Sequence, residues 1–103
     1  MVAKPLLSLE AEQALTSLGQ RLRRLRIERG DTQAQFAKRL GVSTPTVAAM
    51  ENGEPTTRIG YWVEAITLLG RETDLAVLLE PRSSLFERIT NESGTRLRAR
   101  RRR

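Results

Sequence analysis

The chain of 103 residues is 39% hydrophobic and only 4% aromatic, which indicates one small domain with an aliphatic core, followed by a tail. Cysteine and histidine are absent, so a disulfide framework, a structural zinc site, a thiol nucleophile and an imidazole base are excluded. Without a nucleophile–base set, paired carboxylates or a phosphate-binding glycine loop, we expect no enzymatic activity, no metal and no other cofactor. No apolar run could cross a bilayer and no signal-peptide core is present, so we expect a cytoplasmic protein without a membrane partner.

The net charge of +6 is unevenly distributed along the chain. Residues 1–81 contain ten basic and ten acidic side chains, whereas residues 82–103 contain eight arginines and two glutamates. The tail therefore carries the whole basic excess, which favours polyanionic partners. We expect a disordered leader over 1–7, a folded domain over 8–81, and a tail over 82–103 that is either disordered or binds a partner.

The first expected helix begins after Ser8, whose hydroxyl can cap it, and ends at Gly30. Its apolar positions recur at steps of three and four residues: Ala11, Leu15, Leu18, Leu22 and Leu25. This stripe predicts one face that packs on a core, with Arg21, Arg24 and Arg29 largely off it. Gly19 interrupts the stripe, so one long helix and two shorter helices joined there are both open.

Two short helices, at about residues 32–40 and 43–52, are predicted to flank a tight turn at Gly41, where a left-handed backbone is favoured. Thr32 is the expected N-cap of the first helix, and Gln35 is its capping-box partner. The residues expected to pack between the two helices are Phe36, Ala37, Leu40, Val42, Val47 and Met50.

Ser43 is the expected cap of the second of these helices, and Pro45 falls in its first turn, where a missing N–H costs little. Two short helices with a buried inner face and a small-residue turn form a helix-turn-helix, whose second helix fits a DNA major groove. DNA binding is therefore the leading functional hypothesis.

Thr56 or Thr57 is expected to cap a fourth helix that Gly70 closes, and a fifth short helix is expected from about Thr73 to before Pro81. In the fourth helix the apolar residues are expected to form one face: Ile59, Trp62, Val63, Ile66 and Leu69. In the fifth helix the apolar positions are Leu75, Leu78 and Leu79. The predicted fold is all-α: a compact five-helix bundle that contains the helix-turn-helix, with a flexible basic C-terminal tail. Trp62 and Phe36 are assigned to the core rather than to base stacking.

The candidate DNA contacts fall into three groups. The candidates for base edges are Gln33, Thr44, Pro45, Thr46 and Ala49. The candidates for the sugar–phosphate backbone are Ser43 and Asn52, with Arg21, Arg24, Lys38, Arg39 and Arg58 as cationic clamps. None of the short side chains on the second helix forms the two-pronged contacts typical of base readout, so Gln33 is the strongest polar candidate, for an adenine edge or a phosphate.

Some of these residues have a structural alternative. Gln33 could only complete the helix cap, and Thr44 and Thr46 could be solvated. Arg21 and Arg24 could form a solvated face that pairs with Glu28. Glu51 is expected to anchor a turn or an ion pair rather than to perform chemistry.

Several short motifs also carry a family resemblance. They are Leu18-Gly19, Leu22-Arg23, Arg26, Arg29-Gly30-Asp31-Thr32-Gln33, Phe36-Ala37, Leu40-Gly41-Val42-Ser43, Thr46-Val47 and Met50-Glu51-Asn52-Gly53. Together they resemble the Xre/Cro family of phage-repressor-like helix-turn-helix proteins, over about residues 18–70. The resemblance implies a lambda-repressor-like domain that binds palindromic operator DNA as a symmetric dimer. It also implies base contacts from Gln33, Thr44, Pro45 and Ala49, and backbone contacts from Ser43, Thr46 and Asn52.

The segment from Leu69-Gly70 through Asp74-Leu75 to Leu78-Leu79-Glu80-Pro81 is similar to a narrower group, the HipB-like antitoxins. That resemblance implies a repressor of its own operon that binds a HipA-type kinase toxin, with Leu85–Ile89 or the first helix offered to the partner. The predicted function is a sequence-specific double-stranded DNA-binding repressor, the autoregulating antitoxin of such an operon. The alternatives are a phage or mobile-element repressor without a toxin, a helical protein-interaction module, and RNA binding through the Arg-rich tail.

Overall fold

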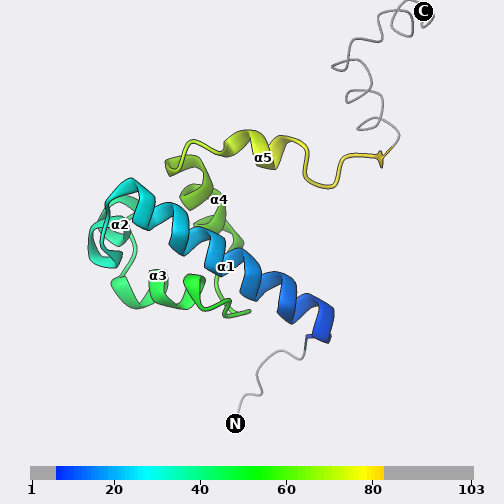
Figure 1. Ribbon diagram of the computed structural model, residues 1–103, viewed down its shortest axis with the longest axis horizontal. Helices are drawn as coiled ribbons and strands as arrows, with labels where there is room; N and C mark the ends of the chain where they lie inside the picture. The colour runs from blue at the N-terminus through cyan, green and yellow to red at the C-terminus, as the bar shows by residue number, and fades with distance from the viewer. Residues whose placement is uncertain (1–6, 83–103) are drawn as a thin grey trace, which may run out of the picture. The chain divides into compact units, whose positions relative to one another are not determined.

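The computed structural model describes residues 7–82, so the expectations for the N-terminal leader, for Leu85–Ile89 and for the Arg-rich tail lie outside the described residues. Within that range the chain is all-helical: α1 (Leu9–Arg29), α2 (Gln33–Leu40), α3 (Thr44–Glu51), α4 (Ile59–Leu68) and α5 (Glu72–Ala76) (Figure 1). The chain divides into two units, Met1–Arg71 and Glu72–Arg103, so α1 to α4 belong to the first and α5 to the second. None of the helices in the described range is long and apolar enough to cross a membrane. The predicted all-α fold class is confirmed.

The first helix is continuous, which settles the alternative that Gly19 left open. The Ser8 hydroxyl accepts a hydrogen bond from the Ala11 backbone N–H at 3.1 Å, and Gly30 ends the helix in the left-handed conformation, with φ of 87°. Gly19 is buried in the middle of α1, where α3 crosses it. A Cβ added there would lie 2.5 Å from the backbone oxygen of Glu51, so the absence of a side chain allows the two helices to approach.

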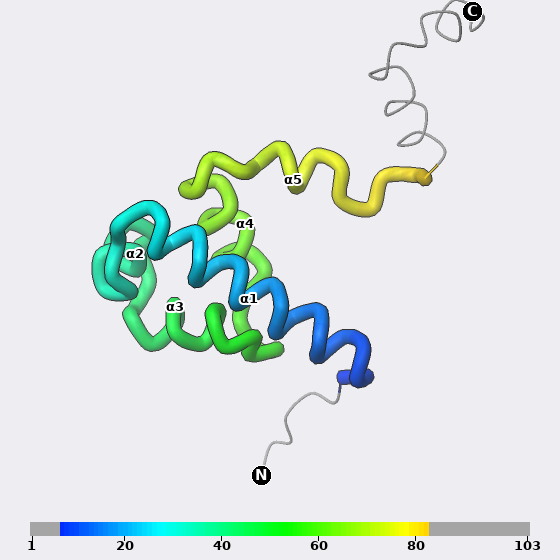
Figure 2. Tube along the Cα trace, viewed as in Figure 1, coloured from blue at the N-terminus to red at the C-terminus, as the bar shows by residue number. Residues whose placement is uncertain are grey.

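The helix-turn-helix forms as its capping residues predict. Thr32 and Gln35 make a complete capping box, in which each side chain accepts a hydrogen bond from the other residue's backbone N–H. Gly41 ends α2 with φ of 76°, and the Ser43 hydroxyl caps α3 by accepting from the Thr46 backbone N–H. α3 packs on both α1 and α2, and α4 packs on α2 (Figure 2). The two helices of the motif are therefore fixed by local signals before any packing is considered.

The core lies between α1, α2, α3 and α4. Its buried residues are Leu22, Phe36, Ala37, Val47, Met50, Trp62 and Ala65. The assignment of Phe36 and Trp62 to the core is confirmed, and Leu40 and Val42 pack against the core while half-buried. In α1 the predicted stripe is buried only at Leu22 and is exposed at Ala11.

Two expectations for the fourth helix are wrong. Neither Thr56 nor Thr57 caps α4: the N-cap is Arg58, which makes no side-chain capping bond, because the helix begins only at Ile59. Ile59 and Val63 are also outside the core, with 77% and 41% of their surfaces exposed. By helical periodicity Val63 lies on the side of α4 away from Trp62 and Ala65, whereas Ile59 is exposed as the first residue of the helix.

The second unit contributes one short helix to the described range. It begins at Glu72, close to the expected Thr73, but ends at Ala76, so Leu78 and Leu79 lie beyond it. Leu79 has φ of 65°, a left-handed conformation that a branched side chain adopts at a cost. The chain can take this conformation only outside a helix, which explains why the helical pattern of leucines is interrupted.

Candidate nucleic-acid interface

The outward face of α3 is defined by what the helix buries. Val47, Met50 and Glu51 point inward, and at about 100° per residue the opposite side of the helix carries Pro45, Ala49 and Asn52. Pro45 and Asn52 are exposed and Ala49 is half-buried. Thr44 is also exposed, but the same periodicity places it nearer to Glu51 than to this face. Three of the predicted contact residues therefore share one surface of the helix.

Ser43 and Thr46 lie together at the start of α3. Their hydroxyl oxygens are 2.9 Å apart and hydrogen-bonded, while Ser43 also caps the helix. Backbone N–H groups at a helix start, together with neighbouring hydroxyls, suit an anionic phosphate. The predicted backbone-binding role of the two residues has the local geometry it requires.

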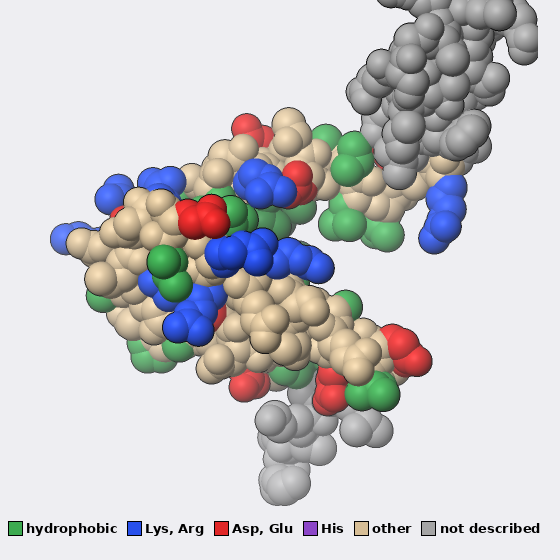
Figure 3. All heavy atoms as spheres, in the orientation of Figure 1, with side chains coloured by type: hydrophobic (Ala, Val, Ile, Leu, Met, Phe, Trp, Pro, Cys, Tyr) green, Lys and Arg blue, Asp and Glu red, His purple; other side chains and the backbone are tan. Residues whose placement is uncertain are grey.

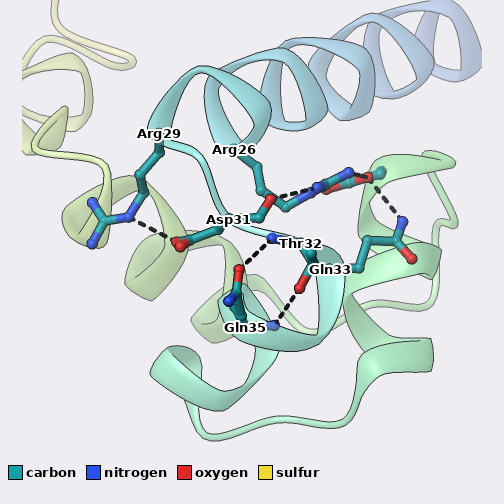
Figure 4. Close-up of polar contacts among 7 residues, drawn as sticks. Arg26, Arg29, Asp31, Thr32, Gln33 and Gln35 are labelled. Carbon is teal, nitrogen blue, oxygen red and sulfur yellow. Dashed lines mark hydrogen bonds and ion pairs between the residues drawn. The ribbon is translucent and has the colours of Figure 1, made fainter.

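Gln33 is the first residue of α2, and its side chain is hydrogen-bonded to the Glu51 carboxylate. Its Nε2 donates to Glu51 Oε1 at 3.0 Å, while Arg26 donates to both oxygens of the same carboxylate, at 2.6 and 3.1 Å (Figure 4). Arg26 and Glu51 are buried, and Arg26 also donates to the backbone oxygen of Asp31 at 2.8 Å. The expectation that Glu51 anchors an ion pair is confirmed. The alternative role of Gln33 in the cap is wrong, because Gln35 fills it.

Two of the predicted cationic clamps have partners within the protein. Arg39 lies 3.2 Å from the Asp31 carboxylate, which Arg29 also contacts at 2.9 Å (Figure 4). The Arg58 guanidinium lies over the Tyr61 ring, 5.9 Å from its centroid. Both arginines remain largely solvent-exposed, so they can still reach an anion, but Arg39 shares its charge with Asp31.

The remaining predicted clamps are Lys38 in α2 and Arg21 and Arg24 in α1, and all three are exposed. Lys38 lies in the last turn of α2. In α1, the face toward α3 is marked by Gly19, and by helical periodicity both Arg24 and Arg21 lie on the side away from it. Neither arginine makes an ion pair with Glu28 in the described part of the chain. The helix therefore places neither Arg24 nor Arg21 on the side of α1 that faces α3.

The family comparison agrees with this geometry. A family model described as helix-turn-helix domain matches residues 17–79. The chain belongs to this helix-turn-helix family. No curated protein and no solved structure matches the chain. Membership supports DNA binding, the function for which the second helix of the motif is suited.

The helix-turn-helix domain also places side chains at this surface that sequence reasoning missed. An open depression of about 520 Å³ lies between α1, the start of α2 and the end of α3. It is lined by Thr16, Gln20, Arg23, Arg26, Gln33, Glu51 and Asn52. Helical spacing could have found Arg23, which is four residues after Gly19 and three before Arg26, on the side of α1 that faces α3. On the face drawn in Figure 3, several Lys and Arg side chains lie over α1 and α2.

Proposed function

We propose that the protein is a sequence-specific, double-stranded DNA-binding transcriptional repressor that acts as a homodimer on a palindromic operator. The observation that carries this proposal is the outward face of α3 in a helix-turn-helix whose two helices are capped and locked to a common core. A rigid helix can hold its exposed side chains in register with base edges, and two copies related by a two-fold axis read two half-sites. Membership of the Xre/Cro group is part of the same proposal.

The base contacts would be mostly apolar. Pro45 and Ala49, with the Thr44 methyl group, present carbon atoms that can contact a thymine methyl, and the Thr44 hydroxyl can pair with either base type. Gln33 would supply the strongest polar contact, with an adenine edge or a phosphate. With so few hydrogen-bonding groups, discrimination between operators would depend on DNA shape and on the spacing of the half-sites as well.

The backbone contacts would come from both motif helices. Ser43 and Thr46 are placed at the start of α3 and Asn52 directly follows it, so they would contact phosphates on either side of the groove. Lys38, Arg39 and Arg58 would add charge from α2 and from the start of α4. Arg24 and Arg21, on the side of α1 away from α3, are the least suited of the predicted clamps.

We further propose that the protein is the antitoxin of a HipA-type toxin–antitoxin operon, with residues 8–81 as its DNA-binding domain. The support is the similarity of the segment Leu69–Pro81 to HipB-like antitoxins. An adjacent gene for a HipA-like kinase, and co-purification of that kinase with this chain, are the expected results. Absence of both would leave a phage or mobile-element repressor as the better description.

The DNA-binding proposal is tested by selecting fragments from a random duplex library at physiological salt. We expect one palindromic consensus, and Ala49→Glu should abolish its binding because a carboxylate would face the DNA. The matched control is Ala11→Glu, the same substitution at an exposed position in α1. A library that yields no preferred sequence would refute operator binding and favour a protein-interaction module built on the same scaffold.

A further inference from the structure

The depression between α1 and the ends of α2 and α3 is lined by seven polar or charged side chains. Two of its three charges cancel, because Arg26 and Glu51 form a buried ion pair at 2.6 Å. The third charge belongs to Arg23, which makes no ion pair with any described residue. The depression therefore carries one uncompensated positive charge at its rim.

From these observations we propose that Arg23 is a DNA-backbone contact and that the depression seats a phosphodiester of the operator. This inference rests on the proposed function, because it places one strand of the operator DNA along one edge of the α3 surface. Asn52, directly after α3, and Gln33, at the start of α2, line the same depression as Arg23. A strand that borders the groove occupied by α3 would pass over Asn52 and bring a phosphate to this rim.

The lining chemistry favours an anion with several acceptor oxygens. Gln20 and Asn52 each carry two amide N–H donors, and the Arg23 guanidinium can offer a fork of donors to two phosphate oxygens. Gln33 gives one N–H to Glu51 and keeps another. A carboxylate would ordinarily repel a phosphate, but Glu51 is buried and fully engaged by Arg26 and Gln33. The depression is thus a donor-rich surface with its one negative group neutralised.

The test uses the full chain and the operator found by the library selection, with binding measured across a range of salt concentrations. Arg23→Ala should reduce the slope of log K against log[salt] by about 0.9 for each protomer bound, because one counterion fewer is released. Arg23→Lys should keep the wild-type slope. The matched control is Arg21→Ala, which removes the same charge from the same helix on the side away from α3 and should leave the slope unchanged.

A second arm locates the contact on the DNA. Neutral methylphosphonate linkages are placed one at a time along the operator. At one position per half-site, the linkage should weaken operator binding by the wild type and leave operator binding by Arg23→Ala unchanged. Equal slopes for Arg23→Ala and Arg21→Ala would overturn the proposal, as would the absence of any such position. An effect of Arg23→Ala on RNA binding alone would also overturn it. Failure to select any operator would instead refute the proposed function, so the two failures are distinguishable.

Discussion

The same substitution, glycine to alanine inside a helix, should have opposite effects at Gly19 and Gly60. In α4, a Cβ at Gly60 meets no atom within 4 Å, so alanine should stabilise the fold by about 0.5–1 kcal/mol through helix propensity. In α1, a Cβ at Gly19 would lie 2.5 Å from the Glu51 backbone oxygen and 2.7 Å from that of Met50, whereas ordinary contact begins at 3.4 Å.

Both obstacles at Gly19 are backbone atoms, so no side chain can rotate away and α3 must move by roughly an ångström. Overpacking of this kind typically costs about 1–3 kcal/mol, and here the movement also strains the Arg26–Glu51 ion pair. After subtracting the gain in helix propensity, we expect Gly19→Ala to lower the free energy of unfolding by about 1–2 kcal/mol.

Thermal unfolding measures both effects, followed by far-UV circular dichroism and by the fluorescence of Trp62, the single and buried tryptophan. For a domain of this size about 1 kcal/mol corresponds to roughly 4–8 °C, so Gly19→Ala should lower Tm by about 10 °C and Gly60→Ala should raise it by about 2–8 °C. Wild-type stability for Gly19→Ala, or a shift of equal sign for both variants, would refute the close α1–α3 crossing.

Three further substitutions test the local interactions. Glu51→Ala leaves the Arg26 guanidinium buried without its carboxylate and should cost about 3–5 kcal/mol in urea unfolding; a cost under about 1 kcal/mol would contradict the burial of the pair. Thr32→Ala removes the capping box of α2 and should cost about 1 kcal/mol, whereas Thr57→Ala, which removes no cap, should change the unfolding midpoint little. Ala49→Glu should abolish operator binding in a gel shift while its melting curve stays close to that of Ala11→Glu, because Ala49 lies on the outward face of α3; retained operator binding would remove that face from the interface.

The helix ends of the motif were predictable because their signals are local. A capping hydroxyl acts on N–H groups two or three residues away, and a left-handed glycine acts on the turn that contains it. The caps at Ser8, Thr32 and Ser43 and the turn at Gly41 therefore follow from the sequence. Where no such signal exists, as before α4, the threonines at 56 and 57 suggest a start that lies before the observed one at Ile59.

The features that sequence reasoning missed depend on contacts between distant segments. Arg26 and Glu51 are 25 residues apart, and nothing near either residue indicates that they meet. Ile59 and Val63 fit an apolar helical face equally well, and only the packing of Trp62 decides that they are exposed. At Gly19 the sequence leaves one continuous helix and two shorter helices both open, because it does not show that α3 approaches the backbone there.

The Glu51 carboxylate links the stability of the fold to the chemistry of the proposed DNA-binding surface. A carboxylate paired with Arg26 only accepts hydrogen bonds, so Gln33 must turn its amino group toward Glu51. The amide orientation that Gln33 would present to DNA is consequently set by a residue buried in the domain. Because α3 itself offers short and mostly apolar side chains, this fixed amide and the phosphate contacts around it would account for much of the polar recognition. A substitution at Glu51 should therefore alter operator choice as well as stability.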